Sequence, residues 1–291
     1  MAKADLAAVL ALAAAFFIAV GDVIHQRSAH EVTDEPVGHL ELFARLLRDG
    51  RWWLGSGVAA IGFALQAAAL GLGSVLLVQA LLVTSLLFAL PISARLSGRR
   101  VTRWEWLWAA LLAAAVAVIV TVGDPTAGAS RASLHTWLWV AAVLGPAMAL
   151  CLLGAQMASP TASAVLLAVV SGGLWGLFAV LTKAVVDRLD VTSWAGVGAL
   201  LSTPELYAWA AVGLAGTALQ QASFRAGALT ASLPTMTVAE PVVASVLGVV
   251  VLGETLRPGE TGVFALAAAV AVMVVATAAL ARGEAATREP A

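Results

Sequence analysis

The chain has 291 residues, of which 61% are hydrophobic and only 11% are charged, and its mean hydropathy is +0.95. A soluble domain carries roughly 25% charged residues, so this composition excludes a water-soluble globular protein and predicts an all-α integral membrane protein. The net charge of −1 offers no surface for nucleic acid, and the single cysteine, Cys151, excludes disulfides within the chain.

The hydropathy pattern predicts about nine transmembrane helices. A bilayer core of about 30 Å needs roughly 20 helical residues per crossing. The stretches that meet this length are 5–27, 52–71, 73–96, 103–122, 134–156, 163–187, 205–226, 229–252 and 260–281. The first lacks a small-residue cleavage pattern, so we interpret it as a retained helix and not as a signal peptide.

Two further intervals are ambiguous. Residues 37–51 are rich in charge, which favours a cytosolic surface helix, and residues 191–202 are apolar but too short to cross, which favours a re-entrant or interfacial piece. The prediction is therefore nine spans, with ten as the alternative.

The lysines and arginines predict the orientation, because cytoplasmic loops carry the excess of positive charge. Because successive spans cross in opposite directions, the predicted spans divide the lysines and arginines into a larger set on one side of the membrane and a smaller set on the other. The larger set is Arg27, Arg45, Arg48, Arg51, Arg95, Arg99, Arg100, Arg103, Arg225, Arg282 and Arg288, and the smaller is Lys3, Arg131, Lys183, Arg188 and Arg257. We therefore expect a cell membrane protein with its N-terminus outside, its C-terminus cytoplasmic and a disordered tail at 283–291.

A weak internal repeat relates the two halves of the chain. The residues that recur, at a constant offset of 154, are Ala64-Leu65-Gln66, Gly73 and Arg103 in the first half and Ala218-Leu219-Gln220, Gly227 and Arg257 in the second. This spacing divides the chain into a first repeat (1–122, spans one to four), a linker with span five (123–162) and a second repeat (163–282, spans six to nine). Because five spans separate equivalent helices, the repeats would be inverted, which is an architecture of secondary transporters. A chance match in an Ala- and Leu-rich chain is the alternative.

Several motifs resemble those of a known family. They are Trp52-Trp53-Leu54, Ser171-Gly172-Gly173 with Lys183, Ala239-Glu240-Pro241-Val242-Val243, and Gly253-Glu254-Thr255-Leu256. Over residues 5–281 the chain resembles the drug/metabolite transporter (EamA-like) superfamily, and within it the NIPA-like magnesium transporter branch. The resemblance implies alternating-access transport of a small solute, without naming that solute. The first half departs from the pattern, because its matching helix ends Ser97-Gly98-Arg99-Arg100 without a glutamate.

Glu240 is the sharpest candidate for a binding residue. It lies near the middle of the eighth span, where a carboxylate costs roughly 2.5–3.5 kcal/mol on insertion scales. Pro241 follows it and removes the amide that would bond the carbonyl of Thr237. A carboxylate beside a free carbonyl and the Thr237 hydroxyl indicates a cation or proton site. The alternative is a protonated glutamate that is hydrogen-bonded within the bundle.

Secondary candidates lie nearer the span ends. Asp22, His25 and Gln26 share one helical face, which fits either a polar helix terminus or a partial divalent-ion site. Lys183 is expected to extend to the interface, with a salt bridge to a substrate carboxylate or to Glu240 as the alternative.

Amide and indole side chains within the spans complete the candidate set. Lipid cannot satisfy a primary amide, so four glutamines should face the interior, either as contacts between helices or as cavity lining: Gln66, Gln79, Gln220 and Gln221. Trp175 lies well inside the sixth span, where it must line a cavity or pack in the bundle. Gly172 and Gly176 form a GxxxG pair that is typical of close helix packing.

Absent motifs argue against an enzyme and against a cofactor. The sequence contains no P-loop, no H-E-x-x-H and no G-x-S-x-G, and its four histidines and one cysteine form no metal-binding pattern. The leading hypothesis is a transporter of a small molecule or ion. A magnesium or other divalent-cation permease and a non-transporting scaffold or receptor subunit are the alternatives, and the small-residue-rich surface permits a homodimer.

Overall fold

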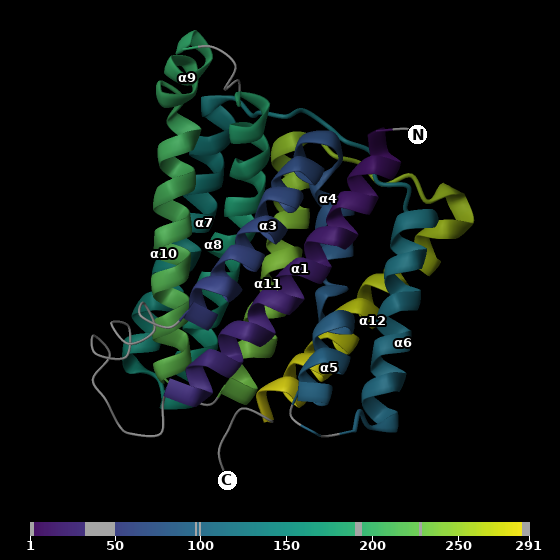
Figure 1. Cartoon of the computed structure of the whole chain (residues 1–291). Coiled ribbons are helices and arrows are strands. Elements are labelled where there is room, and N and C mark those ends of the chain that lie inside the picture. The colour runs from purple at the N-terminus through teal and green to yellow at the C-terminus, as the bar shows by residue number, and fades with distance from the viewer. Residues whose placement is uncertain are drawn as a thin grey trace.

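The computed structural model describes residues 3–32, 50–96, 98, 100–189, 194–226 and 229–286, and its regular elements are helices (Figure 1). In chain order they are α1 (Lys3–Val32), α3 (Gly50–Leu72), α4 (Val75–Leu82), α5 (Ser85–Leu96), α6 (Arg103–Thr121), α7 (Leu134–Met157), α8 (Pro160–Asp187), α9 (Trp194–Leu201), α10 (Pro204–Ala226), α11 (Leu229–Leu252) and α12 (Gly259–Ala286). The predicted surface helix at 37–51 lies outside the described residues, except that its last two residues begin α3. Because α12 continues to Ala286, the first residues of the predicted disordered tail are helical.

Eight segments of the described residues are long and apolar enough to cross a membrane: Lys3–Ile24, Trp53–Leu72, Val75–Leu96, Arg103–Thr121, Leu134–Met157, Pro160–Asp187, Ala231–Leu252 and Gly262–Arg282. They match eight of the nine predicted spans, which confirms a multi-pass helical membrane protein. The predicted seventh span is α10, whose 23 residues are long enough to cross, although Glu205, Gln220 and Gln221 reduce its hydropathy. A ninth crossing at α10 stays a prediction.

The ambiguous interval at 191–202 contains the short helix α9. Its eight residues extend about 12 Å at 1.5 Å per residue, which is too short to cross a bilayer. Figure 1 shows α9 at the upper end of the bundle, beyond α10. The expectation that this interval does not form a full span is confirmed.

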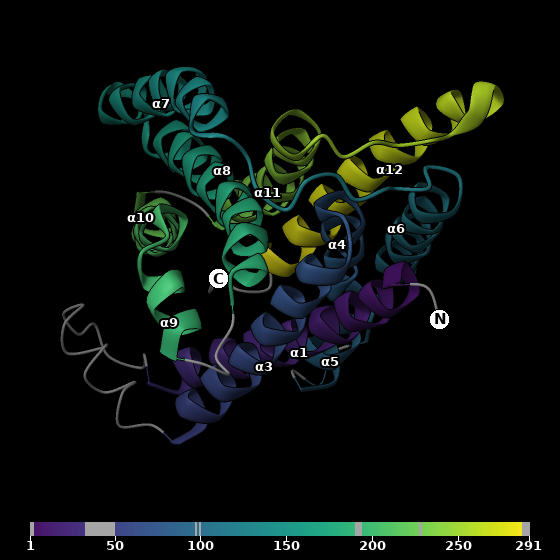
Figure 2. The same cartoon turned by 90° about the horizontal axis from the view of Figure 1, so that it is seen from above.

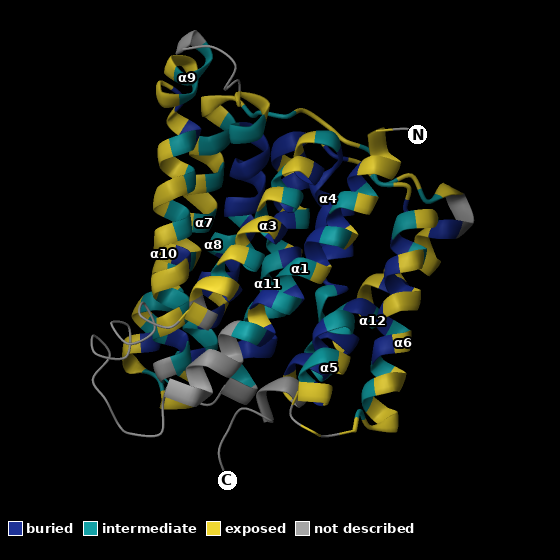
Figure 3. Cartoon of the chain, in the orientation of Figure 1, coloured by how far each residue is buried: buried dark blue, intermediate teal, exposed yellow. Residues whose placement is uncertain are grey.

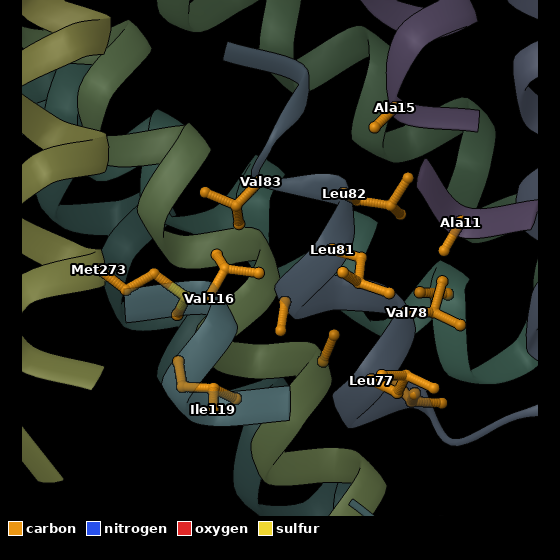
Figure 4. Packing of buried hydrophobic residues seen from close by; sticks show 14 of the residues in the cluster. Ala11, Ala15, Leu77, Val78, Leu81, Leu82, Val83, Val116, Ile119 and Met273 are labelled. Carbon is orange, nitrogen blue, oxygen red and sulfur yellow. The ribbon is translucent and has the colours of Figure 1, made fainter. Parts of the chain in front are cut away.

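The core lies around α4, the most buried helix. Every residue from Val75 to Leu82 is buried, as expected for a helix that is apolar on all faces. Leu77, Leu81 and their neighbours meet side chains of α1, α6 and α12 (Figure 4). By contrast, α6, α7 and α10 carry many exposed positions, consistent with lipid-facing helices (Figure 3).

The predicted third span is two helices, not one. It breaks between α4 and α5 at Val83 and Thr84. The Thr84 amide donates a hydrogen bond to the Leu81 carbonyl, three residues earlier, at 3.0 Å, and the Thr84 hydroxyl donates to the same carbonyl. Threonine side chains compete in this way with the helical hydrogen-bond ladder, so a polar residue inside an apolar stretch ends α4 after eight residues.

Four helix pairings organise the bundle (Figures 1 and 2). α1 packs along α3, α8 packs along both α10 and α11, and α6 packs against α12. α4 lies between the two halves, in contact with α1 on one side and with α8 and α11 on the other. α1 begins at the upper end of Figure 1 and α12 ends at the lower end, so the described chain enters and leaves at opposite ends of the bundle.

Candidate functional site

Glu240 lies on α11, where proline interrupts the backbone ladder. Its side chain is half-buried, and Pro241 follows it. Because proline has no amide hydrogen, the carbonyl of Thr237 loses its partner in the helix. The Thr237 hydroxyl donates to the Leu233 carbonyl at 2.8 Å, so its proton is used within α11 and its oxygen remains an acceptor. The helix thus presents a carboxylate and a carbonyl within one turn.

The glycines of α8 bring that helix against the backbone of α11 at Glu240. A Cβ added to Gly176 would lie 2.8 Å from both the Glu240 carbonyl oxygen and the Ala244 nitrogen. A Cβ added to Gly172 would lie 2.7 Å from the Ala239 Cβ and 3.2 Å from the Glu240 nitrogen. Only glycine permits this approach, so the prediction that the GxxxG pair forms a close-packing face is confirmed.

Asp22 of α1 belongs to the electrostatic environment of Glu240. The charge of Asp22 acts on the Glu240 carboxyl group, and the Asp22 side chain is exposed. Asp22 and Glu240, which are far apart in sequence, therefore influence each other electrostatically. The side chains of His25 and Gln26, predicted on the same helical face, lie outside the described residues.

Trp175 and Gln220, both predicted as candidates, are direct partners. The Trp175 indole Nε1 donates to the Gln220 Oε1 at 3.2 Å, which joins α8 to α10. The Trp175 ring also meets Phe178 edge-on, with ring centroids 5.2 Å apart. One turn away, the Ser171 hydroxyl donates to the Gly216 carbonyl at 2.9 Å. Trp175 therefore packs in the bundle, as one of its two predicted roles required.

The remaining glutamines fall in two different environments. Gln66 and Gln79 are 8% and 2% exposed, whereas Gln221 is exposed and does not lie in the packed interior. The Gln79 amide nitrogen has no hydrogen-bond partner within the described part of the chain. Gln79 lies one turn below Val75, on the α4 face that approaches Gly248 of α11. The expectation that all four glutamines face the interior is therefore wrong for Gln221.

Lys183 corrects a second expectation, because it does not extend to the interface. Its residue exposure is 4%, and its ammonium group donates to Glu254 Oε1 at 2.8 Å and to the Gly73 carbonyl at 2.9 Å. Its partner is therefore Glu254 and not Glu240. A buried charge needs a partner that replaces water, and here that partner comes from a segment 71 residues further along the chain.

Glu254 is the functional-site candidate that sequence reasoning missed. It is 1% exposed, and its carboxylate accepts the Val75 amide at 2.7 Å and the Leu76 amide at 3.0 Å, at the N-terminus of α4. Free amides and the helix dipole favour an anion at this end. The local signal was the Gly253-Glu254-Thr255-Leu256 motif directly after a span, in which Gly253 adopts a φ of +65°.

One relative among curated proteins establishes a family for the chain. An uncharacterized protein of Corynebacterium glutamicum is 39% identical over 284 residues, covering 95% of each chain. The two proteins belong to one family. No protein-family model matches the sequence, and no solved structure matches it.

This family membership extends over nearly the whole bundle. The 284 aligned residues are 95% of each protein, enough to include nearly all of the candidate spans of the described structure. The relative's name states no activity. Among the described residues, no group of three or more His, Cys, Asp or Glu side chains gathers to hold a metal ion.

Proposed function

We propose that the protein is a drug/metabolite-type transporter of the cell membrane, which moves a small solute by alternating access. The observation that carries the proposal is Glu240, placed beside Pro241 where α8 and α11 meet through glycine. A carboxylate inside a membrane is costly and marks ion or substrate pathways. An apolar residue at position 240 would pack between the helices without the cost of burying a carboxylate.

The helix boundaries support two inverted repeats. α3 runs from Gly50 to Leu72 and α10 from Pro204 to Ala226, so α10 begins and ends 154 residues after α3. α11 begins at Leu229, which is 154 residues after Val75 at the start of α4. The same offset relates the sequence matches, and it keeps its value across two interhelical turns. A chance sequence match does not require helices to start and stop in register.

The path of the chain supports nine crossings with opposed termini. α1 begins at one end of the bundle and α12 ends at the other (Figure 1), which requires an odd number of crossings. Eight spans satisfy hydropathy, and α10, with 23 residues, is long enough to be the ninth. By the distribution of lysine and arginine, the upper end of Figure 1 is the outer side and the lower end is cytoplasmic.

Glu240 would serve as the cation or proton site of the cycle. Its carboxylate can release a proton when a cationic solute or coupling ion arrives, and the carbonyl freed by Pro241 adds a neutral oxygen ligand. The charge of Asp22 acts on the same carboxyl group, which favours the entry of positive charge over negative charge. A cationic solute or a solute coupled to protons therefore fits this region best.

A divalent-cation permease is the second candidate, and Asp22 is the observation that favours it. Asp22 is near enough for its charge to act on the Glu240 carboxyl group, and carboxylate oxygens are the ligands that Mg²⁺ prefers. Further ligands would have to come from carbonyls and water, since no larger acidic group gathers among the described residues. The organic solute therefore remains the first candidate.

The decisive experiment is flux into proteoliposomes that hold the purified protein. Magnesium entry would be followed with a trapped indicator, beside a panel of labelled amines and amino acids under an imposed proton gradient. Glu240→Gln keeps the shape of the side chain and removes its charge. Asp187→Asn is the matched control, because Asp187 is an exposed acid at the end of α8.

We expect gradient-dependent uptake of an organic cation that Glu240→Gln abolishes and Asp187→Asn preserves. Saturable magnesium entry with the same mutational pattern would select the divalent-cation permease. A correctly folded protein that is silent for every solute, or transport that persists in Glu240→Gln, would refute the role given to Glu240. Silence across the panel would favour the scaffold or receptor alternative.

A further inference from the structure

Lys183 and Glu254 form a buried charged cluster that the proposed transport site does not use. Their side chains are 5% and 0% exposed, and the Nζ–Oε1 distance is 2.8 Å. The remaining contacts go to backbone atoms where α3 turns into α4, namely the Gly73 carbonyl and the amides of Val75 and Leu76. We call this set of five residues the clamp. Every strong charge in it has a partner.

The clamp connects the two halves of the molecule. Both ionised side chains come from the second half, from the end of α8 and from the segment after α11, whereas their backbone partners belong to the first half. Gly248 makes room for the carboxylate, because a Cβ there would lie 2.9 Å from Glu254 Oε2. Glycine at this position lets α11 approach the α4 N-terminus closely enough for the bonds to form.

A buried ion pair is an expensive way to hold helices together. Desolvation of two charges offsets most of their attraction, and a well-packed apolar pair of similar volume is often as stable or more stable. The neighbouring positions on α4 are apolar and fully buried, so the sequence does provide apolar packing there. The charges therefore indicate a contact that is specific and can be broken, since separated charges regain their hydration.

The position of the clamp is the upper end of the bundle, where α3, α8 and α11 end and α4 begins. A segment that follows α6 crosses the same end. The Ala129 amide donates to the Leu252 carbonyl at 2.7 Å, and the Thr126 amide donates to the Thr255 carbonyl at 2.9 Å. Backbone pairing therefore ties this segment to the chain on either side of Glu254, whereas Asp22, toward the lower end, is exposed.

We propose that the clamp is the outer gate of the protein. Access from the upper end requires α4 to separate from α8 and α11, and that movement must withdraw Glu254 and Lys183 from Val75, Leu76 and Gly73. The gate rests on the proposed transport function, because a static scaffold has no need to open. The gate assigns the opening step of the alternating-access cycle to named residues at the upper end of the bundle. Glu240 alone does not explain that step.

The first test measures opening without measuring transport. Val75→Cys, in a Cys151→Ser background, places a nearly isosteric thiol in the clamp at a side chain that is 0% exposed. Its labelling by a soluble maleimide is followed in nanodiscs, where both ends of the protein are accessible. The double variant Lys183→Met with Glu254→Gln removes both charges together, so no unpaired charge stays buried.

The matched control removes a second ion pair at the same end of the bundle. The Arg131 Nη2 and Glu205 Oε1 atoms lie 2.6 Å apart, and the two side chains are 28% and 11% exposed. The double variant Arg131→Met with Glu205→Gln removes both charges in the same way. We expect the clamp variant to raise the labelling rate about tenfold, which corresponds to about 1.4 kcal/mol in the opening equilibrium. We expect the control to leave the rate unchanged. Equal rates in the clamp variant and the parent would overturn the gate.

A second test locks the gate and keeps the charges. A Cβ added to Gly71 would lie 3.9 Å from the Val186 Cβ, which is within the range of a disulfide. The pair Gly71→Cys with Val186→Cys therefore joins α3 to α8 beside the clamp. We expect the oxidised form to slow hydrogen exchange across residues 73–83 relative to the reduced form. Identical exchange in the two forms would overturn the gate, even where the charge-neutral variant fails to fold.

The outcomes separate the gate from the transport proposal. Faster labelling in the clamp variant, with no solute moved by the parent, would support the gate and leave the solute assignment without support. Transport by the parent, with labelling and exchange insensitive to both perturbations, would support the transporter and refute this gate. Loss of flux on oxidation, with recovery on reduction, is the expected result where both hold.

Discussion

The close contact between α8 and α11 allows a quantitative prediction for Gly176→Ala. The added methyl group would lie 2.8 Å from the Glu240 carbonyl oxygen and from the Ala244 nitrogen, and 3.0 Å from the Val243 Cβ. Ordinary contacts of this kind begin near 3.4 Å, so the two helices must separate by several tenths of an ångström. Backbone atoms cannot rotate away as a side chain does, so the cost should reach the usual overpacking range of about 1–3 kcal/mol.

Gly57→Ala is the matched control within a membrane helix. A Cβ at Gly57 of α3 meets nothing within 4 Å. Alanine replaces glycine inside a helix with a gain of roughly 0.5–1 kcal/mol when there is room for the methyl group. The two substitutions are chemically identical, so their opposite signs would report the packing at α11 and not the change in backbone entropy.

Thermal unfolding of the purified protein in detergent, followed by size-exclusion chromatography, measures both variants. Taking roughly 2 °C per kcal/mol for a chain of this size, Gly176→Ala should lower the midpoint by about 2–6 °C. Gly57→Ala should leave the midpoint unchanged or raise it by about 1–2 °C. A Gly176→Ala protein as stable as the Gly57→Ala protein would refute the close approach of α8 to Glu240, and with it the geometry of the site.

Three further predictions concern polar groups of the bundle. Glu254→Gln alone should destabilise the protein by roughly 3–5 kcal/mol, because Lys183 stays buried without a counter-charge, and adding Lys183→Met should recover most of that loss in the same thermal assay. Trp175→Phe and Gln220→Leu should each cost about 1 kcal/mol, and their double-mutant cycle should show a coupling of similar size, whereas additive effects would contradict the hydrogen bond. Pro241→Ala restores a backbone amide that can bond the Thr237 carbonyl, so the midpoint of thermal unfolding should stay the same or rise. Flux should nevertheless fall at least about tenfold. A proline with only a structural role would not lower flux while preserving stability.

The sequence was sufficient to predict the class of protein and most of its helices. Hydropathy alone predicted eight spans that the structure has, because lipid requires each crossing to be long and apolar. It could not predict the break at Thr84, since a single hydroxyl that bonds back to the Leu81 carbonyl leaves the hydropathy of the stretch unchanged. The sequence predicted α10 as a span, and Gln220, which makes this helix more polar, has its amide oxygen bonded to Trp175 of α8.

Site residues were predictable where the signal was local. Glu240 was proposed because a carboxylate and a proline stand together inside an apolar span, and the glycines of α8 were predicted to pack because their spacing places them on one face. The environment of Lys183 was not predictable, because its partner Glu254 lies at the end of a different helix and is positioned by the positive φ of Gly253. Long-range pairing of this kind has no periodicity that a single sequence can display.

Three buried polar groups lie where the two halves of the protein meet. Lys183 and Glu254 meet the N-terminus of α4, and Gln79 lies one turn below on the face toward α11, whereas Glu240 lies within the second half, where α11 crosses α8. Each of these groups costs free energy in a membrane interior that apolar packing would have avoided. Lys183, Glu254 and Gln79 lie together at this boundary, beside apolar side chains of α4. A boundary that must separate and reform in each cycle gains from groups that can exchange their partners for water, whereas a permanent contact gains nothing from them.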